Sequence, residues 1–205
     1  MRVLVIETAT AACSVALLDD GVVVAAAHEV VGRGHAERLV PMISELPGGG
    51  RADAILVDCG PGSFTGVRVG LAAARALAFG WAIPVHGYGA PALLAAAACA
   101  ERPDLAAVTV AITGGHGELF VQRFGGPDLS ARTSLASLLP AAAAAVAERD
   151  WVVGSGAPAL LAARGDADGA ESLPDAADVR YLAAAFTALP ATPVYGRAPD
   201  AKLPA

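Results

Sequence analysis

The order of predicted strands and helices in the first half of the chain recurs in the second half. Each half opens with short runs of apolar, often β-branched residues, separated by polar or glycine-rich turns. The opening strands are predicted at 3–6, 14–18 and 22–27 in the first half, and at 107–112 and 118–124 in the second. Thr8 and Thr113 occupy matching turn positions. Such a pattern predicts one structural unit that is built twice.

Helices follow the opening strands in each half. The first is predicted at 35–46, where apolar residues recur at helical spacing and a run of glycines ends the pattern. Further helices are predicted at 65–79, 91–99, 134–148, 158–163 and 178–188, and further strands at 54–57, 81–85 and 151–153. We therefore predict an α/β, duplicated actin-like (ribonuclease H-like) fold. Its two lobes, 1–104 and 105–205, would each hold a mixed sheet and flanking helices.

The composition excludes several protein classes. Hydrophobic residues make up 55% of the chain and charged residues 17%, the reverse of the balance in a disordered chain. The longest uncharged apolar run, 90–100, is far shorter than the roughly 20 residues of a membrane-spanning helix. A net charge of −6 argues against autonomous binding to nucleic acid. Cys13, Cys59 and Cys99 have small or apolar neighbours, which predicts reduced thiols in a cytoplasmic protein without a secretory signal.

The sharpest local motif lies between a predicted strand and a predicted helix. It consists of Gly60, Pro61, Gly62, Ser63, Phe64, Thr65 and Gly66, with Arg68 in the helix that follows. Backbone N–H groups at a helix start can bind an anion. The motif lacks the P-loop lysine, however, because Val67 follows Gly66. Ser63 or Thr65 can cap the helix instead, so a structural turn is the favoured interpretation.

No set of residues predicts catalysis, a cofactor site or a metal site. Glu7 ends the first strand, where an actin-like site usually carries an acidic residue, but the turn after it contains no glycine. Leu39 stands four residues after His35, so this helix lacks the pair of histidines that would bind a metal. The other histidines stand singly, and His116 is predicted to be exposed in a glycine-rich turn.

Several strings of residues together resemble one known family. They lie at 6–10, 13–17, 35–41, 60–70 and, in the tail, 193–202. In these strings the chain resembles the TsaB (YeaZ) family, most specifically in Gly-Pro-Gly-Ser-Phe-Thr-Gly. The resemblance implies an actin-like fold and a non-catalytic bacterial subunit of the machinery that forms N6-threonylcarbamoyladenosine on tRNA. It also implies binding to the catalytic paralogue TsaD, with the ATPase TsaE joining the pair, contact with tRNA only indirectly, and no cofactor.

The resemblance places the partner-binding surface on helices of the first lobe. The predicted interface residues are Leu39, Met42, Ile43 and Leu46 of one helix and Val67, Gly70, Leu71, Ala74 and Leu77 of the next. Small residues on one stripe would let a second helix approach closely. The alternative is that both stripes face the protein's own sheet. A homodimer through the same surface is expected when TsaD is absent.

Two other functions stay open at this point. One is a stand-alone ATP-dependent kinase or carbamoyl-type transferase of the actin-like superfamily, and the other is a metallopeptidase. The single lysine, Lys202, and the missing histidine pair argue against them. Two positions depart from the family pattern. The turn at 113–118 stands where relatives usually carry Asp-Ala-Arg, and Gly196 stands where they usually carry leucine.

Overall fold

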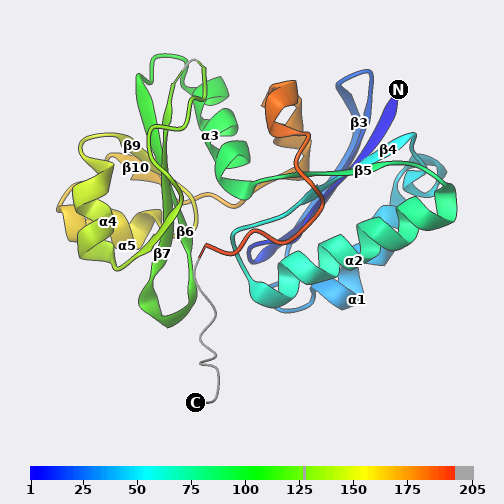
Figure 1. Cartoon of the computed structure of the whole chain (residues 1–205), viewed down its shortest axis with the longest axis horizontal. Coiled ribbons are helices and arrows are strands. Elements are labelled where there is room, and N and C mark those ends of the chain that lie inside the picture. Colours follow the sequence, from blue (N-terminus) through cyan, green and yellow to red (C-terminus); the bar gives the residue numbers. More distant parts are fainter. Residues whose placement is uncertain (127, 197–205) are drawn as a thin grey trace.

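A computed structural model describes residues 1–126 and 128–196, which form two five-stranded sheets with helices around them (Figure 1). The first sheet has the order β3-β2-β1-β4-β5, and its strands are β1 (Arg2–Glu7), β2 (Ala12–Asp19), β3 (Val22–Val30), β4 (Ala54–Asp58) and β5 (Val85–Tyr88). The second has the order β8-β7-β6-β9-β10, and its strands are β6 (Ala107–Thr113), β7 (Leu119–Gly125), β8 (Ala136–Leu138), β9 (Trp151–Val153) and β10 (Gly169–Ala170).

The two sheets have the same topology. In each, the first strand pairs antiparallel with the second and the second antiparallel with the third. The fourth strand then pairs parallel with the first, and the fifth parallel with the fourth. The predicted α/β fold with a duplicated mixed sheet is therefore confirmed.

The helices also correspond between the two halves. α1 (His35–Glu45) and α2 (Phe64–Trp81) precede the fourth and fifth strands of the first sheet. α4 (Pro140–Ala147) and α5 (Ala157–Arg164) hold the same places in the second. α3 (Ala90–Glu101) follows β5 and packs against the second sheet, so it lies between the two lobes (Figure 1).

The core of the first lobe explains why its central strands are apolar on both faces. Leu4 and Ile6 of β1 pack in one cluster with side chains of α1 and α2. Val5, on the opposite face, packs with Tyr88, with Leu93 of α3 and with the short 3₁₀ helix η3 (Ala176–Tyr181). A strand that is covered on both faces needs an unbroken apolar run. β3 lies at the edge of the sheet, and its residues alternate between exposed and half-buried.

Two predicted elements at apolar runs are wrong. The strand predicted at 81–85 begins only at Val85, because α2 continues to Trp81 and ends at Ala82 in a left-handed conformation. The helix predicted at 134–148 is strand β8 in its first part, and α4 begins at Pro140. Short apolar runs do not distinguish strand from helix by periodicity, and a proline at the first helical position marks the true start of α4.

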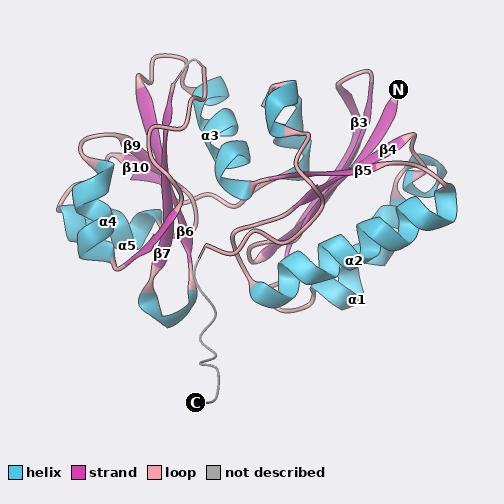
Figure 2. Cartoon of the chain, in the orientation of Figure 1, coloured by secondary structure: helices cyan, strands magenta, loops and turns pink. Residues whose placement is uncertain are grey.

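The last predicted helix is also wrong in extent. In place of a helix at 178–188, the structure has η3 and a second short 3₁₀ turn, η4 (Ala184–Phe186) (Figure 2). This segment returns to the first sheet, where Asp175 accepts a hydrogen bond from Ser14 and Leu189 pairs with Gly87. The boundary at 104/105 thus separates the two sheets, while η3 and Leu189 lie against the first one. The division into two domains stays a prediction.

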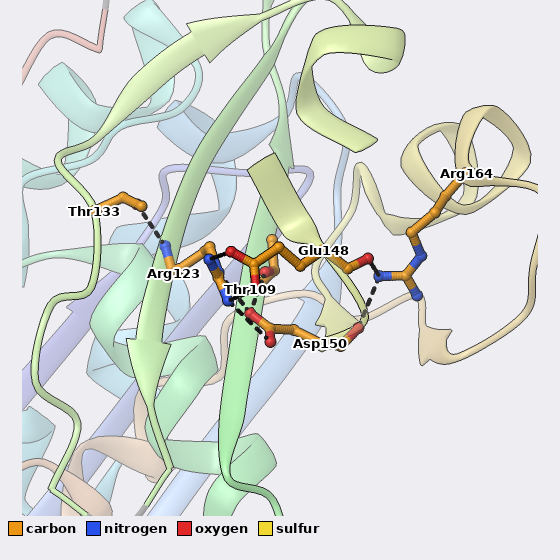
Figure 3. Close-up of polar contacts among 6 residues, drawn as sticks. All are labelled: Thr109, Arg123, Thr133, Glu148, Asp150 and Arg164. Atoms are coloured by element: carbon orange, nitrogen blue, oxygen red, sulfur yellow. Dashed lines mark hydrogen bonds and ion pairs between the residues drawn. The ribbon is translucent and has the colours of Figure 1, made fainter. Parts of the chain in front are cut away.

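A polar network joins the strands of the second lobe at one end (Figure 3). The Arg123 guanidinium on β7 donates to the carboxylates of Glu148 and Asp150, and Thr109 on β6 donates to Asp150 at 3.0 Å. Arg164, at the end of α5, donates to the backbone carbonyls of Glu148 and Asp150. Arg164 is almost buried, and its charge is neutralised by Asp166. The network fixes the turn between α4 and β9 against both neighbouring strands.

None of the described helices is long and apolar enough to cross a membrane.

Candidate functional site

The glycine-rich motif folds over the turn at the end of β1. Ser63 N donates to the Ala9 carbonyl at 2.6 Å, and the Thr8 hydroxyl donates to the Gly66 carbonyl at 2.8 Å. A Cβ at Gly62 would lie 2.0 Å from the Ala9 carbonyl oxygen, and one at Gly66 would lie 2.1 Å from that of Thr8. The glycines are therefore required by the close approach of two backbone segments.

The motif uses its own amide groups to begin α2. Ser63 is the N-cap, and its hydroxyl accepts a hydrogen bond from Gly66 N at 3.2 Å. Thr65, the other predicted cap, is exposed. The turn beneath the motif, residues 8–10, is buried. A phosphate group would have to displace the motif to reach that turn.

Two buried carboxyl groups lie side by side under the motif. Glu7 ends β1 and Asp58 ends β4, and the two strands pair in parallel up to Ile6 and Val57. Both side chains are almost fully inaccessible to solvent. Sequence reasoning identified Glu7 as a possible ligand residue but missed Asp58, because nothing local in the sequence brings β4 beside β1.

Each carboxyl has backbone or hydroxyl donors, but one oxygen has none. Glu7 accepts from Ala9 N at 2.8 Å and from the Tyr88 hydroxyl at 3.1 Å. Asp58 Oδ1 accepts from Gly60 N at 2.9 Å, whereas its Oδ2 has no hydrogen-bond partner among the described residues. Burial raises the pKa of Asp58 to about 7 and raises that of Glu7 well above its ordinary range, with the nearby Asp58 charge as a second cause. Two adjacent buried carboxyls do not both ionise readily, so ionisation of one opposes ionisation of the other.

The structure also places the predicted interface residues. The side chains of Leu39, Met42, Ile43, Leu46, Val67, Leu71 and Ala74 are buried in the chain's own core, and Leu77 packs half-buried against it. A Cβ at Gly70 would lie 2.4 Å from the Thr8 hydroxyl oxygen. These stripes face the first sheet, as the alternative interpretation proposed. The reason is that an amphipathic helix turns its apolar face to its own core first.

The outward faces of the same two helices carry apolar residues that sequence reasoning missed. Val40 of α1 is 60% exposed, and Phe79 of α2 is 92% exposed. Ala72 and Ala76 are also exposed and share one face of α2 with Phe79. The available signal was Phe79 itself, an aromatic residue outside the apolar stripe of its helix.

The hollow between the lobes is acidic. It has a volume of about 260 Å³ and lies between α3, β9 and the segment around η3. Glu101, Glu171 and Asp178 line it, and burial raises the pKa of Asp178. The one arginine of the lining, Arg102, lies over the Trp151 ring at 4.1 Å from its centroid. Carboxylates at this place disfavour a bound polyphosphate.

No metal centre is evident in residues 1–126 and 128–196, since no three His, Cys, Asp or Glu side chains are grouped to hold an ion. His35 is buried, with Nε2 3.1 Å from the Ala12 carbonyl oxygen, and thus links α1 to β2. His116 lies exposed in its turn with a positive φ, as the glycine-rich sequence around it predicted.

Comparison with known proteins identifies relatives of both lobes. The model of the family "TsaD: tRNA N6-adenosine threonylcarbamoyltransferase" matches residues 23–148. The Escherichia coli tRNA threonylcarbamoyladenosine biosynthesis protein TsaB is 46% identical over 92 residues, and the Haemophilus influenzae protein of that name is 44% identical over 90. These alignments span 42% of the chain and only 39% and 38% of the two relatives.

Solved structures extend the match to nearly the whole chain. YeaZ from Pseudomonas aeruginosa is 31% identical with a TM-score of 0.77, over 95% of this chain and 99% of that one. A second crystal structure from that organism, described as similar to peptidase YEAZ, is 31% identical with a TM-score of 0.81, over 96% and 99%. The chain belongs to the TsaB/YeaZ family.

In this TsaB/YeaZ chain the tail runs along the start of α2. Arg68 donates to the Tyr195 hydroxyl at 2.6 Å, and its guanidinium carbon lies 3.2 Å from the centre of the Phe64 ring. Arg75 donates to the Ala191 carbonyl at 2.6 Å, and Val194 N donates to that of Cys59 at 2.8 Å. The motif residue Arg68 therefore holds the tail against the motif. The remaining tail residues of the resemblance, 197–202, lie outside the described residues.

The family departure at Gly196 has a physical reason. A Cβ at this position would lie 2.4 Å from the Phe120 ring of β7. The tail, which is fixed to the first lobe by Val194, thus touches the second lobe at Gly196. A leucine at this place would require the Phe120 ring to move.

Proposed function

We propose that this chain is a non-catalytic accessory subunit that binds the catalytic subunit TsaD in the formation of N6-threonylcarbamoyladenosine on tRNA. The observation that supports the proposal most directly is that the turn at the end of β1 is buried under the glycine-rich motif. Thr8 and Ala9, in the turn where an actin-like enzyme would bind phosphate, are bonded to the motif and buried. The chain keeps the two-lobed shape but has filled the place of the nucleotide.

The electrostatics support the same proposal. Phosphoryl transfer needs a metal-bound nucleotide and cationic groups that stabilise charge. The acids nearest the motif, Glu7 and Asp58, are enclosed, and the hollow between the lobes is lined with carboxylates. A stand-alone kinase or transferase therefore finds little support in the described residues.

We place the surface for TsaD on the outward faces of α1 and α2. Phe79, Val40 and the exposed alanines of α2 offer apolar area that a partner helix can cover. Burial of such area contributes roughly 25 cal/mol per Å². The same surface would serve a homodimer when TsaD is absent. TsaE would join the TsaD pair, tRNA would be contacted only indirectly, and the location would be cytoplasmic.

The test is co-purification with TsaD. Phe79→Glu places a charge on the proposed surface without touching the core, and we expect it to abolish co-purification. Leu139→Glu is the matched control, because Leu139 is 59% exposed but lies in the second lobe. Leu71→Glu and Ala74→Glu are unsuitable, because both residues are buried and a charge there would unfold the lobe.

Two results would contradict the proposal. Retention of TsaD by Phe79→Glu at the wild-type level would reject the surface. Formation of N6-threonylcarbamoyladenosine by the isolated chain, without TsaD, would reject the accessory role.

A further inference from the structure

One surface of this acidic protein is built from two stretches of sequence that contain no acidic residue. The chain has 20 Asp and Glu residues and a net charge of −6, yet none of the 20 falls within 59–100 or 179–196. The first stretch contains the glycine-rich motif and α2, and the second contains the tail. The two stretches meet where the tail runs along α2. The arginines at this place therefore have no acidic neighbour within either stretch.

Arg68 and Arg75 supply the positive charge of this surface. Their hydrogen bonds go to neutral oxygens, since Arg68 donates to the Phe64 carbonyl and the Tyr195 hydroxyl, and Arg75 donates to the Ala191 carbonyl. In the part of the chain that the structure describes, neither arginine forms an ion pair with a carboxylate. A guanidinium has more N–H donors than these bonds use, so both side chains can still bind a carboxylate.

Exposed aromatic rings lie beside Arg68. Phe64 is 68% exposed and Tyr195 is 56% exposed, and their ring centres lie 6.3 Å apart. The Arg68 guanidinium carbon lies close over the Phe64 ring and 5.4 Å from the centre of the Tyr195 ring. These contacts hold the guanidinium in place, so little side-chain entropy is lost when it binds a partner.

The same face of α2 leads to the surface proposed for TsaD. Phe64, Arg68, Arg75 and Phe79 follow one another at intervals of four, seven and four residues, which places them on one face of the helix. Arg68 and Arg75 are two turns apart, which is about 10 Å along the helix axis. This stripe of α2 is therefore aromatic at both ends and cationic between them.

We propose that this stripe, together with Tyr195 of the tail, binds an acidic segment of TsaD. The inference rests on the proposed function and adds the chemistry of the segment that the partner presents. Two carboxylates about 10 Å apart, such as acids two turns apart on a helix, would reach both arginines. Apolar side chains beside those acids would cover the exposed rings. RNA fits less well, because two cations on a chain of net charge −6 neutralise few phosphates.

The test is the salt dependence of TsaD binding by the full chain. We expect Arg75→Gln to weaken binding about tenfold at ~50 mM salt and less than about twofold at ~500 mM, because salt screens the attraction. Arg75→Lys keeps the charge and should keep most of the affinity. Arg149→Gln is the matched control, because Arg149 is exposed but lies in the second lobe. It should bind TsaD as the wild type does at both salt concentrations.

A further variant separates the charge of the arginines from their support of the tail. Tyr195→Phe removes the hydrogen bond to Arg68 but no charge, so it should retain the wild-type salt dependence. A loss in Tyr195→Phe equal to that in Arg75→Gln, at both salt concentrations, would show that binding depends on the position of the tail rather than on charge. That result would overturn the proposal.

The outcomes distinguish this inference from the proposed function. If TsaD binds the wild type and is lost in Phe79→Glu, but Arg75→Gln keeps the wild-type affinity at both salt concentrations, only the acidic segment is rejected. If TsaD does not bind the wild type, both are rejected. Binding of tRNA by the isolated chain, measured by fluorescence anisotropy and lost in Arg75→Gln, would assign the surface to nucleic acid and overturn the proposal.

Discussion

The two lobes share a topology, but the ends of their central strands carry different chemistry. In the first lobe β1 and β4 end in the buried acids Glu7 and Asp58. In the second lobe β6 ends in Thr113, whose N–H donates to the Ser155 hydroxyl at 3.0 Å and whose hydroxyl donates to the Ser155 carbonyl at 3.1 Å. At the end of the first strand, the first lobe therefore has buried titratable groups, whereas the second lobe has neutral hydrogen-bonding groups near solvent.

Both lobes nevertheless have glycine where one backbone segment passes close to the end of the first strand. Gly62 and Gly66 let the motif approach residues 8–9 in the first lobe. In the second lobe a Cβ at Gly154 would lie 2.3 Å from the Ala111 carbonyl oxygen. The backbone crossing is thus required by the topology, whereas the polar groups beneath it are free to differ. Because the second lobe has the same topology without acids at this position, the acids are not needed to form the fold.

The largest expected effect on the free energy of unfolding comes from replacing Asp58, one of the two buried acids of the first lobe. Because the pKa of Asp58 is raised to about 7 in the folded chain, the folded state binds more protons than the unfolded state above pH ~4. The wild-type free energy of unfolding should therefore fall as pH rises from 4 to 7, by at most about 1.4 kcal/mol per pH unit from this group. Asp58→Asn should flatten that fall in urea titrations at several pH values.

Parallel pH profiles for the wild type and Asp58→Asn would show that Asp58 does not titrate in this range. Asn keeps the size of the side chain and its acceptor for Gly60 N, so a loss of packing is not expected.

A smaller effect is expected from filling the space over the β1 turn. Gly66→Ala puts a Cβ against the Thr8 carbonyl and should lower the free energy of unfolding by about 2–3 kcal/mol. Gly115→Ala, in the turn after β6, meets no atom within 4 Å and should change it by less than about 0.5 kcal/mol. Urea midpoints of the two variants make the comparison. Equal losses would show that the close approach of Gly66 to Thr8 does not limit the stability of the fold.

The smallest effect on the free energy of unfolding is expected at Thr113, the neutral residue that ends β6 in the second lobe. Thr113→Val removes one hydroxyl hydrogen bond near solvent and should lower the free energy of unfolding by about 1 kcal/mol or less. The loss should be the same at pH 5 and pH 8, since neither Thr113 nor Ser155 titrates there. Thermal melts at both pH values measure it, and a pH-dependent loss would argue that this position is coupled to a charged group.

Much of the fold could be predicted from the sequence because its signals are local. The β-branched runs and tight turns predicted the opening strands of both lobes, and the matching order predicted the duplicated sheet. Ser63 was one of two candidate caps, and its hydroxyl accepts from Gly66 N. The elements that were mispredicted, at 81–85, 134–148 and 178–188, are short or alanine-rich segments whose conformation depends on tertiary packing.

The sequence by itself determined the repeated order of strands and helices, because hydrophobic spacing and turn residues act within a few residues of each other. Only the tertiary structure decided which face of α1 and α2 is covered, that Asp58 comes to lie beside Glu7, and that the tail reaches Arg68. These outcomes depend on contacts between residues far apart in the chain. Such contacts are selected by the packing of the whole molecule rather than by any local pattern.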